Sequence, residues 1–176
     1  MPLPSFDEFV NQATPNQNPA ATAPLPVLPP YRRPSLAPNG RPWPISSNYV
    51  GGYTQGATGG LSSLMIDNRQ NTTDKFVKLF DRHYARPAAV RVFFVRAHSW
   101  FKLENIRAGT YDVRCQDLDS GDISKSQPFE LEETAQEIEK SDAKRYTHTE
   151  WSRMTITLYT VLNGNTRFDT IGPDDF

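Results

Sequence analysis

Residues 88–96 read Ala-Ala-Val-Arg-Val-Phe-Phe-Val-Arg, an almost unbroken run of β-branched and aromatic side chains. Such a run is typical of a β-strand that is covered on both of its faces. Farther along, residues 110–115 alternate apolar and polar side chains, which predicts that Tyr111, Val113 and Cys115 face inward. The stretch from residue 88 to residue 133 therefore predicts a β-sheet core around which the rest of the chain is organised.

Short polar turns separate further segments of the same kind on both sides of this core. Short strands without alternating helices predict an all-β fold, an antiparallel seven- to eight-stranded β-sandwich over residues 61–170. Residues 134–143 offer few apolar side chains, and we expect either a brief helix or an exposed excursion there. The expected strands cover residues 61–67, 75–80, 88–96, 100–105, 110–116, 123–132 (bulged at Pro128) and 153–161, with a last strand near 167–170, after an Asn163-Gly164 turn.

Proline dominates the opening of the chain, since 12 of the 15 prolines lie in residues 1–47. This segment has too little apolar surface to fold alone, and we expect an extended, polyproline-like N-terminal arm. Residues 48–60 contain five glycines and predict a flexible hinge between the arm and the sandwich. Residues 171–176 are expected to form an acidic C-terminal tail.

The arm carries large apolar side chains that a solvated tether does not need. Ser5 and Glu8 fit a capping box for a short helix near residues 5–11. Trp43, in Pro-Trp-Pro, would waste its large apolar area in water, so we expect it to be pinned against the folded domain or a partner. The predicted partner-binding residues of the arm and the tail are Phe6, Phe9, Val10, Tyr31, Trp43 and Phe176.

Composition argues against several classes of protein. A net charge of −1 leaves no basic excess for nucleic-acid binding. The sequence shows neither a secretory leader nor an apolar run of membrane-spanning length, so we expect a cytoplasmic protein. The single cysteine, Cys115, excludes an internal disulfide framework and is expected to be a buried thiol.

No catalytic, cofactor or metal motif stands out in the sequence, and we expect a protein that is not an enzyme. His83, His98 and His148 are scattered without the spacing of metal ligands or of a nucleophile and its base, which leaves a hydrolase as a weaker hypothesis. Asp117, Asp119 and Asp122 suggest either calcium or a tight turn. Their spacing does not match a calcium-binding loop, and a hairpin turn is favoured.

A second set of residues is compatible with ligand binding by the sandwich. Trp100, Tyr111 and Trp151 are candidate aromatic platforms for a carbohydrate or another small ligand. Basic residues near Trp100 and Tyr84 fit either the binding of single-stranded nucleic acid or sugar rings, or cross-strand ion pairs with Asp112, Glu104 and Asp119, which we favour. These basic residues, which we expect at outward-facing or end positions of their strands, are Arg91, Arg96, Lys102 and Arg114.

One pattern within the predicted sandwich resembles a known family. The run Phe101-x-Leu103-x-Asn105-Ile106-x-Ala108-Gly109-x-Tyr111-Asp112-Val113-Arg114 is followed by Asp117-Leu118-Asp119-Ser120-Gly121 and by Phe129-x-Leu131-x-Glu133. Over residues 61–170 the chain resembles the transthyretin-like or carboxypeptidase-regulatory-like (prealbumin-like) β-sandwich domains of bacterial proteins. The resemblance implies a non-catalytic module that stabilises, spaces or docks other components.

Two functional hypotheses follow from the sequence. The first is a non-catalytic structural or adaptor protein that docks onto a partner subunit through its N-terminal arm, with a homo-oligomer also compatible. The second is a carbohydrate-binding or small-ligand-binding β-sandwich module.

Overall fold

A computed structural model describes residues 30–83, 85–139, 145–159 and 167–176. The contacts between Cα atoms divide the chain into two units, Met1–Pro30 and Tyr31–Phe176. The predicted helix near residues 5–11, with Phe6, Phe9 and Val10, lies outside the described residues, as do Tyr84 and the Asn163-Gly164 turn. Within the described ranges, no helix has the length and apolar character needed to cross a membrane.

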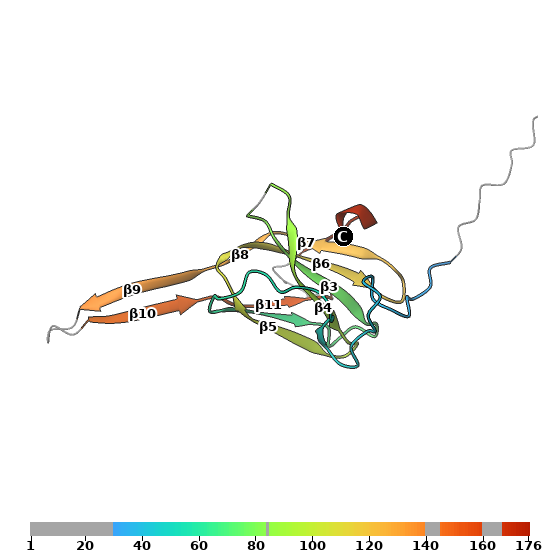
Figure 1. Ribbon diagram of the computed structural model, residues 1–176, viewed down its shortest axis with the longest axis horizontal. Helices are drawn as coiled ribbons and strands as arrows, with labels where there is room; N and C mark the ends of the chain where they lie inside the picture. The colour runs from blue at the N-terminus through green and yellow to red at the C-terminus, as the bar shows by residue number, and fades with distance from the viewer. Residues whose placement is uncertain (1–29, 84, 140–144, 160–166) are drawn as a thin grey trace, which may run out of the picture. The chain divides into compact units, whose positions relative to one another are not determined.

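The unit Tyr31–Phe176 is an all-β sandwich, which confirms the predicted fold class (Figure 1). A large sheet of seven strands packs against a small sheet of three. The large sheet has the order β1(Asn48–Tyr49), β4(Ala88–Val95), β3(Lys75–Asp81), β6(Gly109–Asp117), β7(Ile123–Ser126) and β12(Phe168–Thr170), with β8(Phe129–Leu131) also paired to β6. The small sheet has the order β11(Arg153–Thr157), β2(Ser62–Asp67) and β5(Trp100–Ile106). All pairs are antiparallel except β11 with β2, which is parallel.

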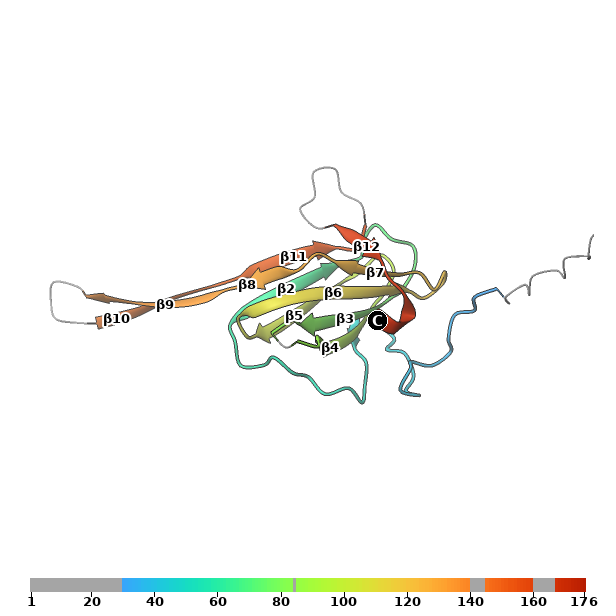
Figure 2. The ribbon, with the colours of Figure 1, turned by 90° about the horizontal axis from the view of Figure 1, so that it is seen from above.

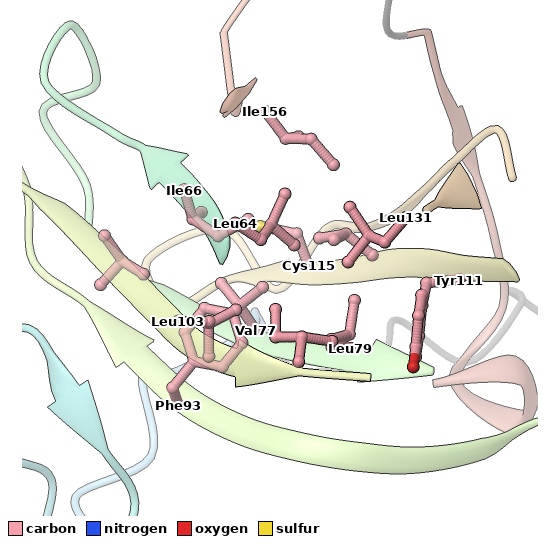
Figure 3. Close-up of a cluster of buried hydrophobic side chains, with 13 residues drawn as sticks. Leu64, Ile66, Val77, Leu79, Phe93, Leu103, Tyr111, Cys115, Leu131 and Ile156 are labelled. Carbon is pink, nitrogen blue, oxygen red and sulfur yellow. The ribbon is translucent and has the colours of Figure 1, made fainter. Parts of the chain in front are cut away.

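The main core lies between the two sheets, and Figure 3 shows its side chains meeting there. In β6, Tyr111, Val113 and Cys115 face this core, as their alternation predicts. In β4, Phe93 and Val95 face the same core, while Val92 and Phe94 face the opposite side of the large sheet. The prediction of a strand that is covered on both faces is therefore confirmed.

The outer face of the large sheet has its own apolar cluster, built on Phe76, Phe94 and Leu118. Its cover comes from the two ends of the described chain. Trp43 packs on Phe76 and Phe94 with ring centroids 5.2 and 5.9 Å apart, and the ring of Phe176 lies 5.5 Å from that of Phe76. We call residues 31–60 the N-terminal cover, because they close this face of the sandwich.

The N-terminal cover corrects the predicted domain boundaries. Residues 48–60 do not serve as a free hinge, because β1 pairs with β4, and Val50 and Gly56 donate backbone hydrogen bonds to Val92 and Val90. The tail is likewise attached, through a 3₁₀ turn at Pro173–Asp175 and Phe176. The physical reason is the apolar outer face of β3 and β4, which would be exposed if residues 31–60 hung free.

The segment after β8 departs from the helical alternative. β9(Glu133–Glu139) and β10(Arg145–Trp151) form an antiparallel hairpin in full register, which extends away from the sandwich in Figures 1 and 2. The expected strand over residues 123–132 is interrupted at Gln127-Pro128, because proline lacks the N–H that a sheet requires. In the described residues of this segment, the chain therefore forms an exposed excursion of two paired strands and not a brief helix.

The Trp43→Ala substitution tests whether the N-terminal cover belongs to the folded domain. We expect it to lower the free energy of unfolding by about 2–3 kcal/mol, because it removes ring contacts with Phe76 and Phe94. The control is Ile45→Ala, two residues away, whose side chain is 90% exposed and which we expect to change stability by less than about 0.5 kcal/mol. Equal effects in urea denaturation would contradict the described cover.

Candidate functional site

The small sheet has one face in the main core and one face turned away from it. Side chains alternate along a strand, so the residues between the inward ones face outward. The pairing aligns outward residues in rows across the three strands, for example Thr155, Met65 and Lys102. The inward side chains are fully buried, and they are Leu64, Ile66, Leu103 and Ile156.

One end of this outward face holds an open hollow of about 460 Å³, which we call the outer hollow. It lies where the hairpin joins the small sheet, because Trp151 ends β10 and Arg153 begins β11. Its lining combines an indole with hydroxyl, amide, carboxylate and cationic groups. The lining residues are Leu61, Ser63, Lys102, Glu104, Asn105, Trp151 and Arg153.

A β-bulge directs two neighbouring side chains of β5 into the outer hollow. Leu103 and Ile106 both point into the core, so two residues rather than one lie between them on the outward side. The register between β2 and β5 shifts at this point, and Asn105 has a left-handed backbone with φ +56°. Bulges commonly re-aim side chains beside functional sites. Here Glu104 and Asn105 both line the outer hollow.

The charges of the outer hollow are only partly paired. Lys102 Nζ donates a hydrogen bond of 2.6 Å to Glu104 Oε1. The Arg153 guanidinium lies 5.2 Å from the centroid of the Trp151 ring, within the range of a cation–π contact. Among the described residues, no carboxylate lies within salt-bridge distance of Arg153. Within the described part of the chain, the outer hollow therefore keeps one positive charge, that of Arg153, without a carboxylate partner.

The other end of the outward face holds Trp100 beside a closed polar network. Trp100 is 48% exposed and pairs in register with Asp67 of β2. Asp67 accepts hydrogen bonds from Arg69, at 2.6 Å to the Nη2 atom, and from the Tyr159 hydroxyl at 3.0 Å. The hydrogen bond from Arg69 holds the pKa of Asp67 below its usual value. Trp100 is therefore an accessible aromatic group at this end, beside the exposed side chain of Arg69.

Two of the three predicted ligand residues lie on this face, and one does not. Trp100 and Trp151 are 48% and 40% exposed. Tyr111 is fully buried in the main core, where its hydroxyl donates to the Arg107 carbonyl oxygen at 2.7 Å, so the prediction of a Tyr111 platform is wrong. Its inward alternation, which was visible in the sequence, already opposed that role. The sequence analysis did not identify Arg153 as a ligand-binding residue. The available signal was its position two residues after Trp151, which is the repeat of side-chain direction along a strand.

The predicted partner-binding residues that the structure describes lie within the domain. Trp43 and Phe176 cover the outer face of the large sheet, and Trp43 Nε1 donates to the Pro34 carbonyl at 2.9 Å. The ring of Tyr31 lies against Gly121, where an added Cβ would approach it to 2.5 Å, yet Tyr31 stays 42% exposed. Of the described members of this set, Tyr31 is thus the most accessible.

The basic residues of the sheets form internal contacts. Asp112, fully buried, pairs with Arg82 at 2.8 Å and with Arg114 at 2.9 Å. Ion pairs therefore form, but Arg114 lies on the same strand as Asp112 and Lys102 on the same strand as Glu104, so the predicted cross-strand arrangement of these pairs is wrong. Arg91 is 1% exposed and donates to the carbonyl of Gly56, so its predicted outward position is wrong. It holds the N-terminal cover against β4.

In the described part of the chain, Cys115 and the three histidines do not come together in a reactive site. Burial raises the pKa of the Cys115 thiol to about 12, which opposes thiolate chemistry. His83 follows β3, His98 lies in the turn before β5, and His148 lies in β10. Within the part of the chain that the structure describes, no group of three or more His, Cys, Asp or Glu side chains is arranged to hold a metal ion.

Comparisons of this chain with family models, with curated proteins and with solved structures gave no match.

Asp117 organises the turn between β6 and β7 that we predicted as a hairpin. Its carboxylate accepts hydrogen bonds from Lys75 Nζ at 2.5 Å, from the Thr73 hydroxyl at 2.6 Å and from the backbone N–H groups of Asp119 and Ser120. Burial alone would raise the pKa of Asp117, but these hydrogen bonds outweigh it and hold the pKa well below its usual value.

Asp117→Asn should lower the free energy of unfolding by about 2 kcal/mol at pH 7, because a charged acceptor of several hydrogen bonds is lost. The pKa of Asp117 is lower in the folded state than in the unfolded state, so its carboxylate stabilises the fold at pH values above its unfolded pKa. The difference in free energy of unfolding between wild type and variant should therefore begin to narrow below about pH 4. Urea denaturation at several pH values measures this difference. Asp119→Asn is the control, since Asp119 is exposed and pairs with exposed Arg33; a difference that stays constant down to low pH would contradict the assigned role.

Proposed function

We propose that this protein is a non-catalytic binding module of the transthyretin-like type, which holds a saccharide on the outward face of its small sheet. The observation that supports this is the outer hollow, where an exposed tryptophan meets hydroxyl, amide and charged groups. The residues first considered for partner binding argue less strongly, because Trp43 and Phe176 cover their own domain. We also keep the expected cytoplasmic location as a proposal.

The lining of the outer hollow matches the chemistry of a sugar ring. The apolar C–H face of a pyranose can lie on the Trp151 indole, whose surface is 40% exposed. Ser63 and Asn105 offer both donors and acceptors, and Glu104 offers acceptors, for ring hydroxyls. Small-ligand sites usually join apolar or aromatic surface to a few placed polar groups. The outer hollow has both kinds of group, Leu61 and Trp151 on the apolar side, and a larger polar share, which suits a ligand rich in hydroxyls.

The charge of the outer hollow favours an acidic saccharide. Arg153 has no carboxylate partner among the described residues, whereas Lys102 is paired with Glu104. A guanidinium binds a carboxylate through two parallel hydrogen bonds, which gives both affinity and orientation. We therefore expect uronic-acid units to bind better than neutral hexoses of the same length.

The adaptor hypothesis stays as a second candidate, because Met1–Pro30 forms a unit of its own and the adjoining Tyr31 is 42% exposed. It assigns Phe6, Phe9 and Val10 to a protein partner. Deleting residues 1–29 should abolish capture of such a partner while saccharide binding persists. Retention of every bound protein by the shortened chain would contradict the adaptor role of the arm.

Trp151→Ala is expected to weaken binding of the best oligosaccharide from a glycan array about tenfold, because the stacking surface is lost. Isothermal titration calorimetry on the full chain measures the change. Tyr146→Ala is the matched control, since Tyr146 is a 52% exposed aromatic of the same strand outside the lining of the outer hollow. Binding that is unchanged in Trp151→Ala, or an array without any bound glycan, would contradict the proposal.

Arg153→Gln is expected to remove the preference for acidic saccharides. The affinity for a uronic-acid oligosaccharide should fall about tenfold, while that for a neutral one of equal length should change little. Arg96→Gln serves as the control, because Arg96 is an exposed arginine that binds the Ile45 carbonyl and lies outside the outer hollow. An equal loss for both oligosaccharides would show that Arg153 only supports the Trp151 ring.

A further inference from the structure

The hairpin of β9 and β10 is a sheet of only two strands. Glu133 to Glu139 pair one to one with Trp151 to Arg145, and both outer edges lack a strand partner within the described residues. Figures 1 and 2 show the hairpin extending from the sandwich in both views. A two-stranded ribbon is marginally stable by itself in water, so further strand pairing would stabilise it.

The two edges differ in how well they are protected against pairing. Natural proteins protect exposed edges with charges, prolines and bulges. β9, Glu-Thr-Ala-Gln-Glu-Ile-Glu, has three glutamates in seven residues. β10, Arg-Tyr-Thr-His-Thr-Glu-Trp, has one glutamate, one arginine and no proline or glycine. Three of its residue types, Tyr, Thr and Trp, favour strands. Self-pairing of β9 would bring two acidic strands together, whereas β10 has no such excess charge.

An apolar pair also lies on the hairpin. Ile138 and Tyr146 are directly opposite each other in the register, and they are 47% and 52% exposed. His148 and Gln136 form the next pair on the same face of the hairpin, because facing side chains repeat every second residue. Association of two hairpins side by side would gather the Ile138–Tyr146 pairs of both copies on one face.

We propose that the β10 edge pairs with β10 of a second copy of this chain, antiparallel and centred on His148. This register uses all seven residues of the strand and is symmetric about a two-fold axis. It places Tyr146 opposite Glu150 of the second copy and Thr147 opposite Thr149, so that Glu150 does not face another carboxylate. The two hairpins then form one four-stranded sheet in the order β9, β10, β10, β9.

A charge exchange at the centre tests the pairing in the full chain. His148→Lys places two cations opposite each other, and His148→Glu places two anions there, so each variant alone should dimerise roughly fivefold more weakly than wild type. An equimolar mixture of the two variants should recover association, because opposite charges then meet. Sedimentation equilibrium over a dilution series measures the mass, which for the wild type should approach twice the 19.9 kDa of one chain.

Gln136→Lys and Gln136→Glu are the matched controls, since Gln136 faces His148 across the hairpin but belongs to β9. They should leave the dimer unchanged. Hydrogen exchange gives a second measurement, in which amide protection of residues 145–151 rises with protein concentration. The proposal is wrong if the wild type stays monomeric, if the mixture fails to recover association, or if the Gln136 variants weaken the dimer equally. It is also wrong if protection rises only in residues 133–139, or if only a different protein binds the hairpin.

Discussion

The structure depends on one constraint: the central strands of the large sheet are apolar on both faces. Val92 and Phe94 point to one side of β4, and Phe93 and Val95 to the other. Each fully buried side chain of this size contributes roughly 1.5–3 kcal/mol relative to its exposed state. The small sheet covers one side, and the other side needs a second cover of its own.

That second cover explains the use of a proline-rich segment in a folded domain. Proline-rich chain cannot pair as a central strand, but it can lie across a sheet and present an isolated large side chain, such as Trp43. Buried Arg91 adds polar attachment, since it donates to carbonyls of Gly56 and Ala57 in the same segment. The large sheet is therefore occupied on both faces, and the outward face of the small sheet remains the exposed one that carries Trp100 and lines the outer hollow.

Much of the fold could be predicted from the sequence, because the unbroken apolar run of β4 and the alternation of β6 report burial directly. The candidate site could be predicted only in part. Trp100 and Trp151 could be identified as isolated large aromatic residues. Tyr111 was wrongly assigned to ligand binding because it is aromatic, although its place in the alternation of β6 predicts that it faces the core. Asn105 and Arg153 enter the outer hollow through a bulge and through the parallel pairing of β11 with β2, and neither is a local property of the sequence.

By itself, the sequence determined the all-β class, most strands of the two packed sheets and the inward residues of β6, since a two-residue hydrophobic period acts between near neighbours. Only the tertiary structure decided where residues 31–60 lie, which strand β11 joins, and that β9 pairs with β10. Those outcomes depend on which distant surfaces need covering and which edges are still free. An apolar face or a free edge of a sheet exists only after several strands have assembled. It is therefore not a property of any single segment of the sequence, and local patterns cannot predict what will cover it.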